Sequence, residues 1–256
     1  MFTARNLYFL IILLLFVTLV LRFFVPISFY VFIVMILAII ALLAYGSSTI
    51  KADFFTKAYH SPTHSRPEIA ITFDDGPTEF TSEILDILKE YDAKATFFCI
   101  GKQVEQNQKV LKRMHYEGHE IGNHSYSHSN FFPFFKKHKI EDELRKTSLL
   151  IENCTGNNVA NFRPPFGVIN NTIVKAAQSN NLKIVGWNLR SFDGVKINSE
   201  RVLQRIIPNI KSGTVLLLHD SRPDSGIILR KVLEDINLKN LRPVTVTQIF
   251  NIDESH

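Results

Sequence analysis

The sequence has few of the features that mark several large classes of protein. It contains only two cysteines in 256 residues, Cys99 and Cys154. Both lie in stretches that predict buried thiols, so a disulfide framework is not expected. No low-complexity tract is present, and no stripe of basic residues accompanies the formal net charge of +5. The sequence therefore gives no reason to expect a disulfide-stapled domain or nucleic acid as a partner.

The first 46 residues lack acidic side chains altogether and carry two basic ones, Arg5 and Arg22. Two uncharged apolar runs, 7–21 and 27–45, lie on either side of Arg22. A helix needs about 20 apolar residues to cross the bilayer core, so the pattern predicts a two-helix transmembrane hairpin over residues 1–46 that contacts membrane lipid. A single kinked helix with a discarded N-terminus is the alternative. A cleaved signal peptide fits less well, because the apolar stretch is too long.

The rest of the chain has nearly balanced charge and the size of one domain. It carries 27 Lys and Arg (29 less the two above) against 24 Asp and Glu, which gives +3. Residues 47–67 are polar and predict a linker, and residues 68–256 predict the folded domain. Predicted strands and helices alternate about seven times, which is typical of parallel strands joined by crossover helices. This repetition favours an α/β fold of the (β/α) barrel type over an open sheet.

The chain is organised around residues 69–77, which read Ile-Ala-Ile-Thr-Phe-Asp-Asp-Gly-Pro. An apolar run closed by Gly-Pro predicts a buried strand, and Asp74 and Asp75 lie at its end. Two neighbouring carboxylates that lose hydration need a positive partner, or one must take up a proton. A divalent metal ion is the simplest partner. Taken alone, the same residues fit a helix N-cap at Asp75 equally well.

Two histidines downstream offer further ligands. His124 and His128 are four residues apart, and on a helical turn this spacing places both imidazoles on one face. One carboxylate with two imidazoles leaves open positions on the ion, which is typical of a catalytic site. Because successive strand residues point opposite ways, we expect Asp75 to face the ion and Asp74 to face a water on it. Zinc lowers the pKa of such a water to about 7, so a nearby carboxylate can take its proton.

Three more predicted strands end in candidate residues. Arg163 is either a cation that keeps Asp74 ionised or one half of a surface ion pair. His219 is either a core histidine or a general acid, since its ordinary pKa near 6.5 suits protonation of a leaving amine. Trp187 is either a core residue or a surface for stacking. Chemistry in (β/α) barrels lies at the carboxyl ends of the strands, so this shared placement favours a single site.

These motifs, in this order, are similar to those of the polysaccharide deacetylase (NodB-like) family, carbohydrate esterase family four. The resemblance covers about residues 68–250, and it rests on four segments: 72–77 (TFDDGP), 124–128 (HSYSH), 163–167 (RPPFG) and 217–219 (LLH). It implies a distorted (β/α) barrel. It also implies removal of N- or O-acetyl groups from sugars of chitin, peptidoglycan and related polymers, with one divalent metal ion.

The resemblance further implies a role for each site residue. Asp74 is the general base, Arg163 orients it, and His219 is the general acid. Leu217 lines the pocket for the acetyl methyl group, and Phe166 gives its backbone N–H to the oxyanion. The divalent ion, expected to be zinc, is held by Asp75, His124 and His128.

One motif departs from the family pattern. The family often has Asp-x-x-Asp-Trp after the strand that carries Trp187, and here the register reads Arg190-Ser-Phe-Asp193-Gly194. Arginine replaces the first acid and glycine replaces the aromatic residue. The carboxylate expected to tune the general acid is therefore missing or moved, and Asp193 is the candidate substitute. Gly194 cannot stack on a sugar, so the substrate wall is also altered.

The sequence as a whole predicts a membrane-attached, metal-dependent N-deacetylase that acts on acetamido sugars of a polysaccharide such as peptidoglycan or a chitin-like polymer. One alternative is a deacetylase of a lipid-linked or small acetamido sugar, and another is an inactive sugar-binding relative. The aromatic segment 130–135 either replaces the missing sugar wall or packs under the membrane hairpin or against the barrel. Family habit places the catalytic domain outside a bacterial inner membrane. The positive-inside rule, with Lys51, Lys57 and Arg66 after the second run, favours both ends in the cytoplasm.

Overall fold

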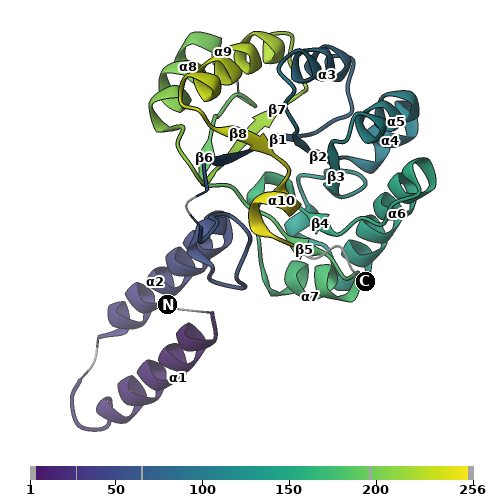
Figure 1. The fold of residues 1–256 in the computed structure, drawn as a ribbon. Helices are drawn as coiled ribbons and strands as arrows, with labels where there is room; N and C mark the ends of the chain where they lie inside the picture. The colour runs from purple at the N-terminus through teal and green to yellow at the C-terminus, as the bar shows by residue number, and fades with distance from the viewer. Residues whose placement is uncertain (1–3, 27, 65, 196–197, 253–256) are drawn as a thin grey trace.

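The computed structural model describes residues 4–26, 28–64, 66–195 and 198–252 (Figure 1). Its strands are β1 (Glu68–Asp74), β2 (Thr96–Cys99), β3 (Glu120–Asn123), β4 (Asn161–Phe162), β5 (Lys183–Ile184), β6 (Leu189–Arg190), β7 (Thr214–His219) and β8 (Arg242–Val244). Its α-helices are α1 (Ala4–Leu21), α2 (Phe29–Ser48), α3 (Thr81–Glu90), α4 (Gly101–Gln106), α5 (Gln108–Tyr116), α6 (Lys137–Thr155), α7 (Asn171–Ser179), α8 (Ser199–Ile206), α9 (Ser225–Leu238) and α10 (Val246–Phe250).

The strands form one curled parallel sheet in the order β5-β4-β3-β2-β1-β7-β6, with β8 also paired to β1. Every ladder between described strands is parallel. Figure 1 shows helices α3 to α9 around the outside of this sheet. The alternation of strands and helices thus gives the predicted α/β architecture, a curled half-barrel consistent with a distorted (β/α) barrel.

Strand β1 lies at the centre because its residues suit a position buried on both faces. All seven are buried, and the run from Ile69 to Phe73 is almost wholly apolar or β-branched. Such runs form strands that are covered on both sides, as in parallel sheets. Strand β7 pairs with β1 over six residues, and this register sets Asp74 beside His219. The two strand ends are therefore neighbours at the carboxyl edge of the sheet.

The segment predicted as a linker, 47–67, contributes to the barrel. Tyr59 forms a parallel bridge with Val185 next to β5, with hydrogen bonds of 2.9 Å from Tyr59 N–H to the Ile184 carbonyl and from Gly186 N–H to the Tyr59 carbonyl. Ile50 and other apolar residues of this segment are buried in the main core. The segment thereby covers the edge of β5, which would otherwise expose unpaired backbone groups.

The N-terminal residues form two helices that extend away from the barrel (Figure 1). Among the described helices, α2 alone is long and apolar enough to cross a membrane, because its 20 residues span about 30 Å. The apolar part of α1, Asn6–Leu21, is shorter than this length criterion. One of the two predicted spans therefore meets the criterion. Ile27, where the second apolar run begins, lies outside the described residues.

Candidate active site

The predicted site residues converge at the carboxyl ends of the strands. Asp74 ends β1 and His219 ends β7, and His124 directly follows β3. Arg163 directly follows β4, and its backbone N–H donates to the carbonyl of Asn123 at 3.0 Å. Residues that are up to 145 positions apart along the chain thus face one another, as expected for a (β/α) barrel.

Asp75, His124 and His128 form a three-donor cluster. Oδ1 of Asp75 lies 3.6 Å from Nε2 of His124 and 3.5 Å from Nε2 of His128. The three donor atoms all lie within 4.8 Å of one another, and His124 is buried. Tetrahedral zinc ligands with bonds of about 2.0 to 2.1 Å lie about 3.4 Å apart, so this spacing suits one small divalent ion.

The two histidines approach each other through a loop, and the expectation of a helical turn is wrong. No helix is assigned to residues 124–131, and both Ser125 and His128 have positive φ, at 63° and 47°. Oε2 of Glu143, on α6, accepts hydrogen bonds from the backbone N–H groups of Tyr126 and Ser127 at 3.1 and 2.8 Å. Sequence reasoning missed Glu143, which holds this loop in place from a neighbouring helix.

Asp74 and Asp75 do not diverge as strand alternation predicts. Asp75 lies just beyond β1 and has a φ of 78°, so the chain has already turned out of the pleat. Oδ2 of Asp74 is 3.9 Å from Nε2 of His124, and the same nitrogen is 3.6 Å from Asp75. Both carboxylates therefore border the same imidazole, on the side where a metal would sit.

The orientation of the two histidines suits a divalent ion. Nδ1 of His124 is 2.7 Å from the carbonyl of Arg163, which can only accept, so Nδ1 carries a proton and Nε2 is the nitrogen that faces the other donors. Burial, together with the charge of His124, lowers the pKa of His128 to about 4 against the opposing effect of the carboxylates. A neutral His128 is likewise a ligand. The residues present therefore fit one divalent metal ion.

Arg163 and Asp74 form a buried ion pair. Nη1 of Arg163 donates to Oδ1 of Asp74 and to Oγ1 of Thr72, both at 2.7 Å, and Nη2 donates to the Gly186 carbonyl at 2.8 Å. The guanidinium is fully buried and its Cζ lies 4.1 Å from the centre of the Phe98 ring. Burial raises the pKa of Asp74, but Arg163 and the nearby histidines outweigh it, and the pKa lies below its ordinary value. Asp74 is therefore ionised and fixed in direction.

Asp193 is the carboxylate that contacts His219. Nδ1 of His219 donates to Oδ1 of Asp193 at 2.6 Å, and the His219 backbone N–H donates to Oδ2 at 2.9 Å. Burial lowers the pKa of His219, but the hydrogen bond and charge of Asp193, with the charges of Asp74 and Asp75, raise it to about 9. Asp193, the candidate to replace the missing carboxylate of the altered motif, therefore does contact His219. His219 is partly exposed, and its Nε2 is 3.9 Å from Asp75.

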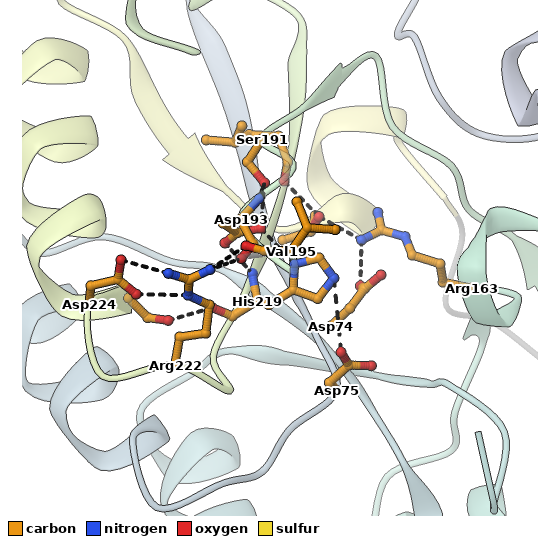
Figure 2. A network of polar contacts seen from close by, with 12 residues as sticks. Asp74, Asp75, Arg163, Ser191, Asp193, Val195, His219, Arg222 and Asp224 are labelled. Carbon is orange, nitrogen blue, oxygen red and sulfur yellow. Dashed lines mark hydrogen bonds and ion pairs between the residues drawn. The ribbon is translucent and has the colours of Figure 1, made fainter. Parts of the chain in front are cut away.

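Two residues missed by sequence reasoning hold Asp193 in place (Figure 2). Oγ of Ser191 donates to Oδ1 of Asp193 at 2.5 Å. Nη1 of Arg222 donates to the backbone carbonyls of Asp193 and Val195 at 2.6 and 2.5 Å, while its Nε binds Asp224 at 2.8 Å. Arg222 follows His219 by three residues, and this closeness in the sequence could have identified it as a neighbour of the site.

Asp220 is a further buried acid beside the site that the sequence reading passed over. Its Oδ2 accepts a hydrogen bond from Oγ1 of Thr81 at 2.5 Å, and burial raises its pKa to about 7. The carboxylate lies against Gly76, where it leaves no room for a Cβ. This contact explains why the residue after Asp75 has no side chain.

The remaining predicted site residues divide into buried and exposed ones. Leu217 is buried in β7, and Trp187 is buried with its ring against Gly167, so Trp187 packs under the site rather than stacking in the open. Phe166 is 44% exposed, has a φ of 60°, and its ring centre lies 4.6 Å from that of His128. Phe166 thus borders the three-donor cluster at His128.

The aromatic segment 130–135 is divided between the interior and the surface of the protein. Phe132 is fully buried, whereas Phe131 and Phe134 are 70% and 83% exposed. Nδ2 of Asn170 donates to the Pro133 carbonyl at 2.8 Å and fixes this segment next to α7. The segment therefore packs inside the protein at one residue and presents two aromatic rings to solvent.

A curled (β/α) barrel with a potential metal centre and a buried acid–arginine pair at its strand ends defines the class of this protein. A family model described as polysaccharide deacetylase matches residues 61–185. A peptidoglycan-N-acetylglucosamine deacetylase of Bacillus cereus is 33% identical over 202 residues, which are 77% of this chain and 72% of that protein. The chain belongs to the polysaccharide deacetylase family.

Solved structures agree with this assignment. The crystal structure of a peptidoglycan N-acetylglucosamine deacetylase has a TM-score of 0.72 and 32% sequence identity, and the match covers 77% of this chain and 94% of that chain. A protein of Bacillus anthracis described as a CE4 family pseudoenzyme has a TM-score of 0.69 and 28% identity, over 76% of this chain and 68% of that chain. The fold alone therefore does not decide whether a member is active.

Proposed function

We propose that this protein removes N-acetyl groups from acetamido sugars of a polysaccharide such as peptidoglycan, with one divalent metal ion, zinc, held by Asp75, His124 and His128. The observation that carries the proposal is the convergence of this three-donor cluster with an ionised Asp74 and a protonated His219 at one edge of the sheet. The relatives named peptidoglycan deacetylases support the substrate class. The reaction adds water across the amide bond and yields acetate and a free sugar amine.

The chain's own residues supply the proton transfers and the orientation. When bound, the ion supplies Lewis acidity, which polarises an acyl oxygen and makes a water more acidic. Asp74, kept ionised and directed by Arg163, accepts a proton from the attacking water. His219, held by Asp193, donates a proton to the departing amine. The Phe166 backbone N–H stabilises the oxyanion, and Leu217 contacts the acetyl methyl group.

The proposal is tested by measuring acetate release from three classes of substrate: peptidoglycan, chitin oligomers, and lipid-linked acetamido sugars. The full-length protein is assayed after metal chelation and again after zinc is restored. We expect release from at least one polysaccharide that is lost on chelation and regained with zinc. Release from the lipid-linked sugars alone would assign the activity to that class instead. A complete lack of release would make this chain an inactive sugar-binding relative.

The pH profile depends on Asp193. Since the folded pKa of His219, about 9, lies above its ordinary 6.5, His219 is protonated at neutral pH and loses its proton as the pH rises through about 9. The stability that this pairing contributes is complete below pH 6.5 and is lost as the pH rises from there through about 9. In Asp193→Asn the charge is removed, so the basic limb of kcat/KM should move about one pH unit or more toward lower pH.

This prediction is checked with pH profiles of kcat/KM for the parent, Asp193→Asn and Asp142→Asn. Asp142 lies on α6 with its side chain exposed, so its replacement serves as the matched control. A bound cation shifts all three profiles, and the difference between the variants is therefore the informative quantity. An unmoved basic limb in Asp193→Asn would show that Asp193 does not set the acidity of His219.

We also propose that α1 and α2 form a hairpin anchor over residues 1–46, with the catalytic domain outside the cytoplasm. The length and apolar composition of α2 support a span, and Oγ1 of Thr18 on α1 lies 3.8 Å from Sδ of Met35 on α2. An extracytoplasmic domain would meet its polymeric substrate. Reporter fusions after Ser48 test the orientation, and cytoplasmic reporter activity would reverse it.

A further inference from the structure

The altered fourth motif brings two arginine side chains against one aromatic ring. Cζ of Arg190, at the end of β6, lies 4.7 Å from the centre of the Phe192 ring. Cζ of Arg205, on α8, lies 4.5 Å from the same centre. The two guanidinium carbons are therefore at most 9.2 Å apart, which is the sum of these distances. Guanidinium groups stack favourably on aromatic rings, so Phe192 holds two like charges close together.

Neither guanidinium has a carboxylate partner in the described part of the chain. No Asp or Glu oxygen of the described residues lies within 4.0 Å of the side-chain nitrogens of Arg190 or Arg205, and both residues are exposed. Several other arginines do have such a partner: Arg113, for example, pairs with Asp86 at 2.5 Å. Two neighbouring positive charges without a counter-charge repel each other, and an added anion relieves that repulsion.

The backbone at Phe192 is held in an uncommon conformation. Its φ is 63°, a value that bulky residues rarely adopt and that persists only where the surroundings enforce it. On one side, the Ser191 N–H donates to the Leu217 carbonyl at 3.3 Å, and on the other, Asp193 binds His219. Such strained positions cluster at ligand clamps, which makes this loop a candidate for substrate contact.

The loop lies directly beside the general acid. Asp193, the residue after Phe192, binds Nδ1 of His219 at 2.6 Å. A Cβ added at Gly194 would lie 3.0 Å from Cε1 of His219. The main chain that carries Phe192 therefore forms the wall of the site next to the imidazole that protonates the leaving amine.

Arg190, at the start of the same loop, lies near the segment that carries Phe166. Cζ of Arg190 lies 5.6 Å from the Trp187 ring, and that ring packs against Gly167. Phe166, next to Gly167, is the residue that borders His128. Arg190 is exposed at the carboxyl end of β6, so it lies on the same edge of the sheet as the candidate site.

We propose that Arg190, Phe192 and Arg205 form a subsite for a carboxylate carried by the glycan substrate next to the reacting acetamido sugar. The proposal rests on the deacetylase function proposed above and specifies its substrate class. Guanidinium groups bind carboxylates through paired, charge-assisted hydrogen bonds. A neutral sugar offers no such group, so the subsite favours anionic acetylated glycans over neutral ones. The carboxylate belongs to a sugar substituent or to a peptide attached to it.

The experiment compares one peptidoglycan fragment in two forms, with free carboxylates and with the same carboxylates converted to amides. Acetate release by the full-length, zinc-loaded protein gives KM and kcat for each form. In Arg190→Gln and in Arg205→Gln, KM for the free form relative to the amidated form should rise about tenfold, and in the double variant about a hundredfold. Arg190→Lys should keep part of the preference. Added salt should weaken the preference of the parent protein.

Arg145→Gln is the matched control, because Arg145 is an exposed arginine on α6 and Figure 1 shows α6 and α8 on different sides of the barrel. It should leave both KM values unchanged. The same fragment without its peptides, again compared in its free and amidated forms, locates the carboxylate. A retained preference for the free form assigns the carboxylate to the sugar, and a lost preference assigns it to the peptide. Both results support the subsite.

Three results would overturn the subsite. The first is a parent protein with equal KM for the free and amidated forms. The second is a change in the arginine variants that is equal for the two forms, which would indicate a purely structural role. The third is a lack of acetate release from either form, which would remove the deacetylase proposal as well. Turnover without charge preference would remove the subsite alone.

Discussion

Asp75→Ala and His128→Ala are each expected to lose bound divalent metal and acetate release together. Each variant removes one of three donors that lie within 4.8 Å of one another, and the remaining two cannot retain the ion. Because the proposed ion would supply the acidity of the nucleophilic water, turnover should fall by about three orders of magnitude or more. Metal content is measured by elemental analysis of the purified full-length protein, and turnover by acetate release.

His138→Ala is the control for this experiment. His138 is an exposed histidine on α6, and its replacement removes an imidazole without touching the donor cluster. It should retain both metal and turnover. Full acetate release by Asp75→Ala in the absence of metal would refute the metal centre. Metal bound by the parent without any acetate release would instead favour the inactive sugar-binding alternative, to which the solved pseudoenzyme relative gives a structural precedent.

Asp74→Asn is expected to retain the metal but to lose most of its turnover. An amide at this position can still accept the hydrogen bond that Arg163 now donates to Oδ1 at 2.7 Å, so the local geometry is maintained. It cannot accept a proton from water at neutral pH, and the loss of a general base typically reduces the rate by about 10² to 10⁴. The metal content separates this result from that of the ligand variants.

Stability must be followed in the same variant, because Asp74→Asn leaves a buried guanidinium without its counter-charge. Removing one partner of a buried ion pair typically costs about 3 to 5 kcal/mol. Chemical unfolding followed by the fluorescence of Trp187, the one tryptophan in the sequence, shows whether the protein is folded under assay conditions. Folded, metal-loaded Asp74→Asn with parental turnover would place the general base elsewhere.

The site requires Asp74 to be ionised although it is buried. Burial disfavours its charge, and Arg163, His124 and His219 together restore it, so its pKa is lowered. A group with a lowered pKa contributes stability above its ordinary pKa and loses it as the pH falls through the folded value. Asp74 is therefore ionised above about pH 4, where His128 loses its proton, so a charged base and a neutral His128 can coexist in the site.

The loop between His124 and His128 illustrates a limit of sequence patterns. A four-residue spacing predicts two side chains on one helical face, and the two imidazoles do converge. They converge through positive φ angles at Ser125 and His128 and through hydrogen bonds that backbone N–H groups of the loop donate to Glu143 on α6. The spacing identified the residues correctly, whereas the conformation depended on a contact with a distant helix.

The partner of His219 illustrates the same limit for the altered motif. The sequence left the tuning carboxylate either missing or moved, with Asp193 as a candidate. The contact of 2.6 Å depends on Ser191 and Arg222, which fix the loop through hydrogen bonds to the side chain and the backbone of Asp193. These bonds join the loop after β6 to the end of β7 and to the loop that follows it, and no local sequence pattern encodes the contacts between the two strands.

The sequence by itself determined the α/β architecture, because strand and helix periodicities follow from local apolar patterns, and it determined which strands carry polar residues at their ends. It also determined that the first 46 residues are unlike the rest. Only the tertiary structure decided how Asp75 turns toward the histidines, which acid serves His219, and that Arg190 and Arg205 share one aromatic ring. These features depend on positive φ angles and on hydrogen bonds and ring contacts between distant segments, which exist only after the strands have assembled into the barrel.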